Sequence, residues 1–277
     1  MTRRRALVFD SGVGGLSVLD AIVAAGAAVD LDYVADTAWL PYGAKSDEAL
    51  RARVPQLLDA VVREWAPDAV VIACNTASTI ALDAVRARLT IPVVGVVPPI
   101  KPAAAQTKTG VIGVLATPAT IARPYTDDLV ARFAADCTVI RFGSTALVAA
   151  AERRLAGGPA DAGAVAEAIA GLFHAPGGDR LDVVALACTH FPLLVDDLAA
   201  AAPRRVAWLD SGAAVAARLM AVLGVGADDR GVRLRRAGFT GAAATWEAFE
   251  ARGFTARAVI GAEPAFAVRP ADDAGLA

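Results

Sequence analysis

The sequence predicts an α/β protein with two pseudo-symmetric, doubly wound, mostly parallel sheets and a ligand site in the crevice between them. Short runs rich in valine and isoleucine alternate with longer alanine-rich amphipathic stretches, a pattern typical of βαβ units. Two of these runs have similar endings, because VVIACNTAS carries Cys74 and VVALACTHFP carries Cys188. A second echo relates Asp10-Ser11-Gly12 to Asp210-Ser211-Gly212. Together the echoes predict two related halves.

The expected strands are short apolar segments: Ala6–Asp10, Leu31–Ala35, Ala69–Ala73, Pro92–Val97, Val111–Leu115, Thr138–Arg141, Val183–Ala187 and Val206–Leu209. The expected helices between them have the length of crossover connections: Asp47–Glu64, Thr79–Leu89, Pro118–Phe133, Ala162–Phe173 and Ala213–Leu223. Near the end of the chain we expect a strand over Val232–Thr240 and a helix over Ala243–Ala251. From Glu263 onward we expect little order.

Two boundaries divide the expected halves. The prolines at 98, 99 and 102 in VVPPIKPAA mark the first, because proline continues neither a helix nor a central strand. The second crossing is expected near Pro203–Leu209. We therefore expect a discontinuous first domain of residues 1–97 plus 209–277, which carries Cys74, and a second domain of residues 98–208, which carries Cys188.

Composition limits the class of protein. The chain has 277 residues, of which 56% are apolar and 20% charged, enough for a sizeable core. Lys and Arg total 27 against 29 for Asp and Glu, so no basic excess favours nucleic acid as a ligand. No run of eighteen uncharged apolar residues suggests a membrane span. We expect a cytoplasmic protein that binds neither nucleic acid nor membrane.

The cysteine count predicts a reducing compartment. Three cysteines form no disulfide framework, and the sequence has neither a CxxC pair nor a Cys/His cluster at metal spacing. The sequence therefore predicts no metal. No lysine stands in a setting typical of a pyridoxal Schiff base, so we also expect no cofactor.

The two repeated cysteines are the strongest candidates for chemistry. Cys74 precedes NTAS and a helical pattern, so main-chain N–H groups and hydroxyls gather there, an arrangement that binds carboxylates and favours a thiolate. Cys188 precedes THFP, whose Pro192 suits the first turn of a helix. Either cysteine alone could equally be a small buried core residue. The repeated context favours a shared polar crevice.

Other polar residues stand near these cysteines or at strand ends. Asp10 either caps the next helix or manages a thiol proton, and Ser11 is a candidate for binding substrate. The following GVGG is only a loose match to a dinucleotide loop. His190, two residues after Cys188, is a candidate acid or base. In ADTAWLPYGAKS, the turn at Tyr42-Gly43 can offer main-chain donors to an anion.

Several residues are expected to be structural from the sequence alone. Glu152, in LVAAAERRL, reads as surface charge. His174 reads as an exposed residue at a helix end, and Cys137 as core.

Taken together, these segments resemble the glutamate racemases of the cofactor-independent aspartate/glutamate racemase superfamily. The resemblance spans nearly the whole chain and is carried, in order, by VFDSGVGGLSVL, ADTAWLPYGAKS, ACNTAST, IPVVGVVPPIKPA, GVLATPATIARPYTDDL, ACTHFPLL and LDSGAAVA. CNTAS and CTHFPLL together are highly specific, whereas GVGG or PYG alone is not. The resemblance implies an active site between the two domains and no cofactor.

The resemblance also implies roles for individual residues. Cys74 and Cys188 are the implied catalytic bases, with Asp10 and His190 as their helpers, and Glu152 matches a family glutamate near the second cysteine. The implied glutamate contacts are Asp10, Ser11, Tyr42, Gly43, Asn75, Thr76, Thr189 and His190. The implied role is the supply of D-glutamate for peptidoglycan synthesis. A homodimer and a UDP-linked peptidoglycan-precursor activator are left open, and Pro98-Pro99 departs from the usual single proline.

Alternatives remain at this point. An aspartate racemase, a hydantoin racemase or a single-thiol decarboxylase would share the fold, although paired cysteines disfavour the decarboxylase. One methylene changes binding by only about 1–3 kcal/mol, so substrate length cannot be read from these residues. A protein that mainly restrains DNA gyrase is a further alternative, which the intact pair of thiols disfavours.

Overall fold

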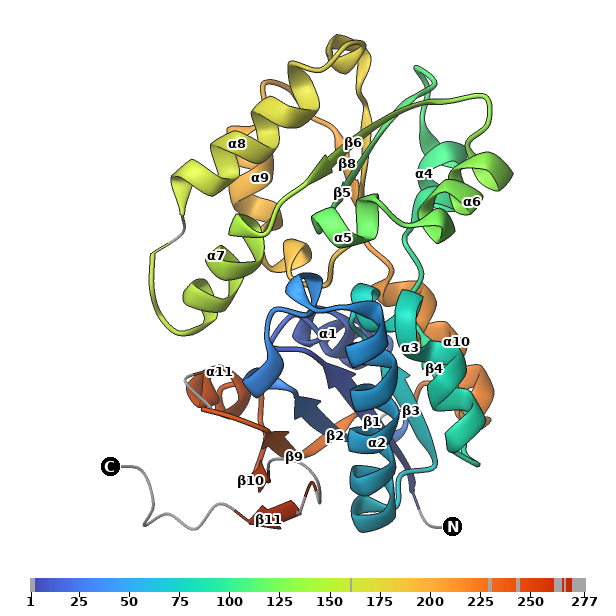
Figure 1. The fold of residues 1–277 in the computed structure, drawn as a ribbon, viewed down its shortest axis with the longest axis vertical. Coiled ribbons are helices and arrows are strands. Elements are labelled where there is room, and N and C mark those ends of the chain that lie inside the picture. Colours follow the sequence, from blue (N-terminus) through green and yellow to red (C-terminus); the bar gives the residue numbers. More distant parts are fainter. Residues whose placement is uncertain are drawn as a thin grey trace. The chain divides into compact units, whose positions relative to one another are not determined.

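The computed structural model describes residues 3–159, 161–228, 231–242, 245–261, 266 and 268–270 (Figure 1). The chain divides into two compact units. The first consists of Met1–Val96 with Gly212–Ala277, and the second of Val97–Ser211. Both are parallel sheets with flanking helices, which confirms the predicted α/β class. No helix among these residues combines the length and the apolar character needed to cross a bilayer.

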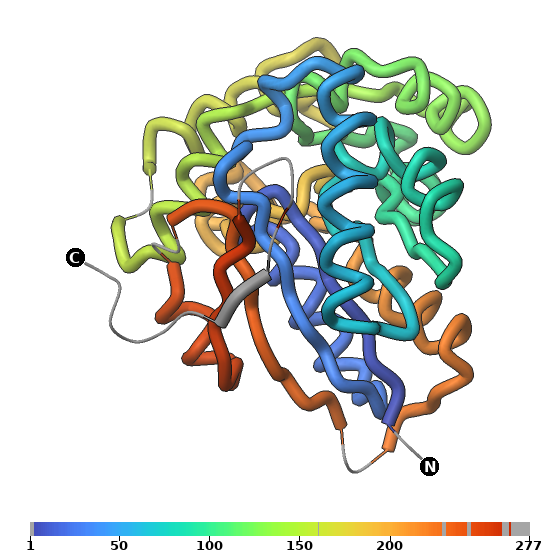
Figure 2. The backbone as a smooth tube through the Cα atoms, turned by 60° about the horizontal axis from the view of Figure 1, so that its bottom comes forward, coloured from blue at the N-terminus to red at the C-terminus, as the bar shows by residue number. Residues whose placement is uncertain are grey.

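The first unit is built on a seven-stranded sheet with the order β11-β10-β9-β2-β1-β3-β4, parallel except for the β10–β11 pair. Its strands are β1 (Arg4–Asp10), β2 (Val29–Ala35), β3 (Ala69–Ile72), β4 (Val93–Gly95), β9 (Arg233–Phe239), β10 (Ala256–Ile260) and β11 (Val268–Pro270). Its helices are α1 (Leu16–Ala24), α2 (Asp47–Trp65), α3 (Asn75–Arg88), α10 (Gly212–Leu223) and α11 (Trp246–Glu250), with short 3-10 helices η1 (Thr37–Trp39) and η2 (Tyr42–Ala44). Figure 2 shows the late segment β9 running beside β2.

Helices cover both faces of this sheet, which explains why its strands read as continuous apolar runs. On one face, Leu7 and Phe9 of β1 and Ile72 of β3 share a buried core with α2 and α3. The helix α10 lies against β3 and β4 and also contacts α1.

The second unit has a four-stranded parallel sheet with the order β6-β5-β7-β8. Its strands are β5 (Val111–Ala116), β6 (Thr138–Gly143), β7 (Val183–Leu186) and β8 (Ala207–Leu209). Its helices are α4 (Ile100–Gln106), α5 (Pro118–Ile121), α6 (Pro124–Phe133), α7 (Ala146–Leu155), α8 (Ala162–Phe173) and α9 (Val195–Ala201), with short 3-10 helices η3 (Gly178–Arg180) and η4 (Phe191–Leu194). Residues of α4 and α6 share a core with β5 and β7.

The two sheets contain the same four-strand arrangement. In the first unit the order β2-β1-β3-β4 follows the chain order second, first, third, fourth, and β6-β5-β7-β8 repeats it. In this correspondence β3 matches β7, so Cys74 and Cys188 follow equivalent strands. The expected pseudo-symmetry thus has a concrete form, to which β9, β10 and β11 are an addition in the first unit.

The similarity between Asp10-Ser11-Gly12 and Asp210-Ser211-Gly212 does not reflect this repeat, so that part of the sequence prediction is wrong. Asp10 ends β1, whereas Asp210 follows β8, and the equivalent of β8 is β4. Asp10 is fully buried and Asp210 is exposed, so the two identical tripeptides lie in different environments. The residue equivalent to Ser11 is Thr117, which comes directly after β5.

Several element boundaries also differ from the predicted ones. The helix expected over Pro118–Phe133 is two helices, because Pro124 begins a new first turn after Arg123, which is extended. Pro102 lies inside α4, near its start, where a missing N–H is tolerated. The strand expected over Pro92–Val97 is limited to Val93–Gly95. Much of the end from Glu263 lies outside the described residues.

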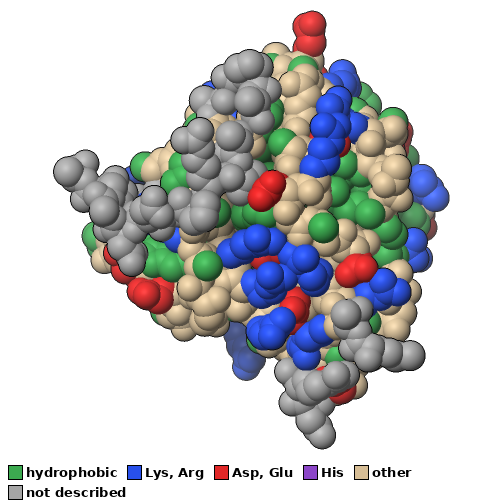
Figure 3. Space-filling model, turned by 90° about the horizontal axis from the view of Figure 1, so that it is seen from below, with side chains coloured by type: hydrophobic (Ala, Val, Ile, Leu, Met, Phe, Trp, Pro, Cys, Tyr) green, Lys and Arg blue, Asp and Glu red, His purple; other side chains and the backbone are tan. Residues whose placement is uncertain are grey.

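Arginines gather at the amino ends of the strands of the first unit, on the face drawn in Figure 3. Two buried aspartates of β2 hold them: Asp30 pairs with Arg3 and Arg233, and Asp32 pairs with Arg5 and Arg236. Each carboxylate is buried, so the paired guanidinium groups offset the cost of removing it from water. This edge is a structural ion-pair network.

Candidate active site

In the first unit, the polar residues lie at the carboxyl ends of three neighbouring strands. Asp10 ends β1, Asp36 follows β2, and Cys74 comes two residues after the end of β3. Main-chain bonds join the three ends, because Asp36 N donates to Asp10 O at 3.0 Å and Ala73 N donates to Phe9 O at 2.8 Å. Ligands of open α/β sheets bind at this edge.

Cys74 is the N-cap residue of α3, which begins four residues earlier than the sequence predicts. Its Sγ accepts from Ala77 N at 3.5 Å and lies 3.8 Å from Ser11 Oγ. The side chain is 6% exposed. The positive end of the helix dipole favours negative charge at this position, so the fold suits a thiolate as well as a thiol.

Asp10 lies in a tightly packed turn around Gly15, the residue before α1. The Asp10 Oδ1 accepts from Gly12 N at 2.8 Å, and the carboxylate is fully buried. A Cβ atom at Gly15 would lie 2.9 Å from the Asp10 Cβ, 3.1 Å from the Ala73 Cβ and 2.6 Å from the Tyr33 hydroxyl. Glycine therefore allows the turn after β1 to approach β3.

Asn75 and Thr76 form the start of α3 and are both buried. The Asn75 Oδ1 has no hydrogen-bond partner among the described residues. An unpaired buried acceptor is costly to a folded protein, which is explained when a ligand donor meets it.

Asp36 is the centre of a buried cluster that includes Tyr42. The Tyr42 hydroxyl donates to Asp36 Oδ2 at 2.6 Å. Arg53 and Thr240, which the sequence analysis did not single out, also bond to Asp36. Burial, followed by the charge of Asp36 and its hydrogen bond, raises the pKa of Tyr42 well above its usual value, with a smaller contribution from Cys74. The phenol therefore stays protonated, and Tyr42 lies within electrostatic reach of Cys74.

In the second unit, Cys188 begins a relay of three side chains. Its Sγ lies 3.8 Å from His190 Nδ1, and His190 Nε2 lies 2.7 Å from Glu152 Oε1. Cys188 and His190 are buried, and Glu152 reaches them from α7 with 19% of its side chain exposed. Sequence alone assigned Glu152 to the surface, whereas the structure places its carboxylate against the imidazole of His190.

The imidazole of this relay favours its charged form. Burial alone lowers the pKa of His190, but hydrogen bonds to Cys188 and Glu152 and the charges of both partners raise it well above its usual value. An imidazolium can stabilise a thiolate on one side while a carboxylate holds it on the other. Thr189, between the two, is also buried.

Polar residues at two further strand ends of the second unit were missed by sequence reasoning. Thr117 follows β5, caps α5 by accepting from Thr120 N at 3.2 Å, and is buried. Ser144 follows β6 and is also buried. These are the positions of Ser11 and Asp36 in the first unit. For Thr117, the sequence feature that could have identified it is a hydroxyl residue directly after the apolar run GVIGVLA.

The remaining candidates lie elsewhere. Cys137, which the sequence assigns to the core, is only half-buried and packs against the core of the second unit. His174 is exposed at the end of α8, as expected from the sequence. Within the described ranges, no three His, Cys, Asp or Glu side chains are grouped so that they could hold a metal.

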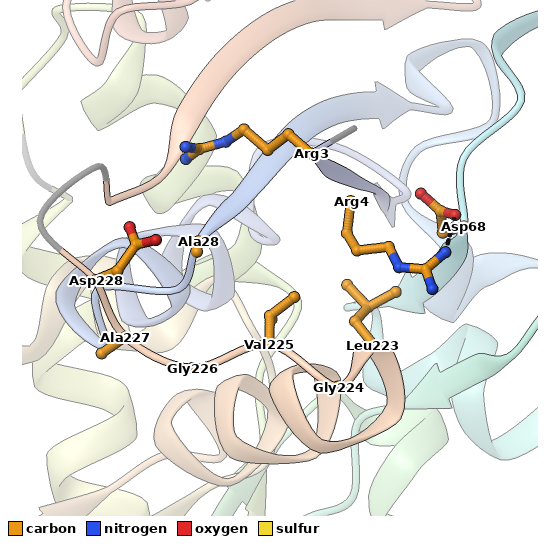
Figure 4. Close-up of a pocket in the computed structure, with 10 residues that line it drawn as sticks. All are labelled: Arg3, Arg4, Ala28, Asp68, Leu223, Gly224, Val225, Gly226, Ala227 and Asp228. Atoms are coloured by element: carbon orange, nitrogen blue, oxygen red, sulfur yellow. Dashed lines mark hydrogen bonds and ion pairs between the residues drawn. The ribbon is translucent and has the colours of Figure 1, made fainter. Parts of the chain in front are cut away.

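A hollow of about 610 Å³ lies at the opposite edge of the first unit, near the start of β1 (Figure 4). Arg3, Arg4 and the loop after α10 line it, and Arg4 pairs with Asp68 at 2.8 Å. None of the predicted site residues borders this hollow.

The chain is similar to known racemases over most of its length. The model of the Asp/Glu/Hydantoin racemase family matches residues 10–219. A glutamate racemase of Sphingopyxis alaskensis is 56% identical over 213 residues, covering 77% of this chain and 80% of that relative. A glutamate racemase of Pectobacterium carotovorum is 48% identical over 217 residues, covering 78% and 75% of the two chains.

Solved structures agree with the sequence relatives. The Escherichia coli glutamate racemase in complex with L-glutamate and the activator UDP-MurNAc-Ala superposes with a TM-score of 0.84 at 36% identity, covering 97% of this chain and all of that one. The glutamate racemase isoform RacE1 of Bacillus anthracis superposes with a TM-score of 0.77 at 27% identity, covering 95% and 99%. The chain therefore belongs to the Asp/Glu/hydantoin racemase family and is a racemase enzyme.

Proposed function

We propose that this enzyme interconverts L-glutamate and D-glutamate by two-base proton transfer at Cα, with Cys74 and Cys188 as the two bases. The observation that carries the proposal is that the two thiols follow equivalent strands and that each has its own polar partners. The relatives named above support glutamate as the substrate. The product D-glutamate would supply peptidoglycan synthesis in the cytoplasm.

Inversion of a carbon centre explains the need for two thiols. One base must take the proton from one face of Cα while an acid delivers a proton to the other face. In the proposed step the Cα–H bond breaks, its proton forms an S–H bond on one cysteine, and the other cysteine gives up its S–H proton to Cα. One thiolate and one thiol thus exchange states in each turnover.

The surroundings of each thiol support a helper role for its neighbours. Ser11 and the start of α3 lie beside Cys74, and Asp10 precedes Ser11 at the end of β1. His190 lies beside Cys188 and is held by Glu152. We assign proton abstraction from D-glutamate to Cys74 and from L-glutamate to Cys188, as the resemblance implies. These roles make Asp10, His190 and Glu152 part of the catalytic machinery.

Substrate contacts are proposed from the polar groups at the same strand ends. The unpaired Asn75 Oδ1 suits the α-ammonium group, and the hydroxyls of Ser11, Thr76 and Thr189 suit the carboxylates. The Tyr42 hydroxyl is engaged with Asp36, so we assign the contact of Tyr42 and Gly43 to their main chain. Fixed donors stabilise the charge that develops on the substrate as the proton leaves.

The direct test uses heavy water and each enantiomer separately. A two-base enzyme places solvent deuterium at Cα of the product, which NMR or mass spectrometry detects. Inversion without deuterium at Cα would contradict the proposal. Cys74→Ala should abolish turnover, and changing either cysteine to serine should reduce both directions, because each thiol is base in one direction and acid in the other.

Substrate choice is tested by comparing turnover of L-glutamate with that of L-aspartate. Faster turnover of aspartate would identify aspartate rather than glutamate as the substrate, without contradicting the two-base step. Adding UDP-MurNAc-Ala, the activator in the Escherichia coli complex, tests whether this enzyme is also activated. Sedimentation tests the homodimer that the resemblance leaves open.

We also propose that the two compact units are functional domains, with residues 1–97 plus 209–277 providing Cys74 and residues 98–208 providing Cys188. The repeated strand order supports this division. Both domains would then contribute one base to a single substrate.

A further inference from the structure

Arg53 and Asp36 form a buried ion pair beside the Tyr42 turn. Arg53 Nε lies 2.7 Å from Asp36 Oδ2, and Arg53 Nη2 lies 2.8 Å from Asp36 Oδ1. Arg53 is 4% exposed and Asp36 is fully buried. The guanidinium also stacks on Trp39, with its carbon 4.5 Å from the ring centre. Two charged groups are thus removed from water at one point.

The core of the first unit has no evident need for this pair. The neighbouring α2 residues Val54, Leu57 and Leu58 are fully buried and already anchor the helix. Replacing a buried ion pair by apolar residues is often neutral or stabilising, so burial of the pair calls for another explanation.

Asp36 uses its carboxylate to hold segments that lie far apart in the sequence. Oδ2 accepts from the Tyr42 hydroxyl and Oδ1 accepts from the Thr240 hydroxyl, each at 2.6 Å. Thr240 in turn accepts from Ala38 N at 3.1 Å. The segment from Thr37 to Ala44 is therefore fastened to the ends of β2 and β9.

We infer that Arg53 is a positioning residue that acts through Asp36 to hold Tyr42 and Gly43 for substrate binding. The inference rests on the proposed contact between these two residues and glutamate. Arg53 fixes the plane of the carboxylate with two parallel bonds, so the direction of the bond from Tyr42 is fixed as well.

Arginine suits this task better than lysine. Its planar fork meets both carboxylate oxygens and stacks on an aromatic ring, whereas a lysine ammonium is a single point charge. Lysine at position 53 would therefore keep the charge but lose the two parallel bonds that fix the carboxylate plane.

The test compares Arg53→Met and Arg53→Lys with Arg63→Met in steady-state assays with each enantiomer. Arg63 is the matched control because it also lies on α2 and pairs with an aspartate, Asp59, but its side chain is 75% exposed. We expect Arg53→Met to raise KM about tenfold or more while kcat changes by about threefold or less, which marks a loss of binding rather than of chemistry. The KM of Arg53→Lys should lie between those of wild type and Arg53→Met, and the KM and kcat of Arg63→Met should equal those of wild type.

Thr240→Val keeps the inference testable if Arg53→Met fails to fold. It removes the hydroxyl bond to Asp36, together with the bond from Ala38 N to the same hydroxyl, and leaves the ion pair in place. We therefore expect a KM rise of about two- to tenfold, the effect of a lost hydrogen bond. Circular dichroism and thermal melting establish folding. Wild-type KM in folded Arg53→Met overturns the inference, as does wild-type KM in both Arg53→Lys and Thr240→Val.

Wild type in the same assay separates this inference from the proposed function. Absence of glutamate turnover by wild type would contradict the function. Normal turnover by wild type, with unchanged KM in the variants, would contradict the role of Arg53 alone.

Discussion

At the scale of single residues, the two thiols have different partners although they follow equivalent strands. Cys74 lies at a helix N-terminus beside a hydroxyl, whereas Cys188 lies beside an imidazole that Glu152 holds at 2.7 Å. The first arrangement offers a fixed dipole, and the second offers a group that can change its charge. This difference makes the second thiol the one whose environment responds to pH.

Glu152→Gln should lower the pKa of His190, because the charge of Glu152 and its hydrogen bond raise that pKa in the native protein. Imidazole NMR signals followed across pH measure the shift. The chain has only two histidines, so the signals of the exposed His174 are the reference against which those of His190 are assigned. An unaltered His190 titration in the folded variant would remove Glu152 from the relay.

The raised pKa of His190 also predicts how stability depends on pH. In the unfolded chain a histidine titrates near 6.5. Because the folded pKa is higher, the interaction stabilises the fold fully below about pH 6.5 and is lost as pH rises through the folded value. The difference in unfolding free energy between wild type and Glu152→Gln should therefore shrink with rising pH in urea titrations. A constant difference would show that the charge of His190 is not involved.

At the scale of elements, the carboxyl ends of β1, β2 and β3 bring the first half of the site together. Small or hydrogen-bonding residues at each end make this possible: Gly15 permits close approach, Asp36 joins two loops, and Cys74 caps α3. The sequence predicts the strands well because buried parallel strands are continuous apolar runs. It also predicts the starts of α2, α5 and α8, but it misses the start of α3, whose cap residue Cys74 is recognised only by its bond.

Gly15→Ala should destabilise the protein by about 1–3 kcal/mol, the usual cost of overpacking. The added Cβ would meet the Tyr33 hydroxyl, which cannot move away easily because it donates to Gly12 O at 2.9 Å and its ring packs against Phe249. Denaturant unfolding measures the change. Gly226→Ala is the control, since nothing lies within 4 Å of its added Cβ. Equal stability of the two variants would contradict the tight packing at Gly15.

At the scale of the whole molecule, a four-strand unit occurs twice, and the first copy is extended by β9, β10 and β11. The added strands widen the sheet and also contact the candidate site, because Thr240, directly after β9, bonds to Asp36. Residues 204 positions apart thus meet at one carboxylate.

Glutamate should raise the stability of the whole protein if it binds the native state as proposed. At a concentration one hundred times its dissociation constant, a ligand adds about 2.7 kcal/mol to the unfolding free energy. Thermal melting with increasing L-glutamate, and with L-aspartate in parallel, measures this effect. Asn75→Ala should weaken the response to glutamate by removing a substrate contact. A melting temperature independent of glutamate would contradict binding.

The amino-acid sequence alone is enough to predict the α/β class and to single out the two cysteines with their hydroxyl and amide neighbours, because strand periodicity and the residues after a strand are local properties of the chain. The partners of those residues depended on tertiary structure. Glu152 meets His190 across 38 residues, and Arg53 meets Asp36 across 17, on separate elements. Strand order and burial reject the similarity between Asp210 and Asp10, since β8 corresponds to β4 and Asp210 is exposed. Strand order depends on which apolar faces pack together, and that is decided by the folded chain as a whole.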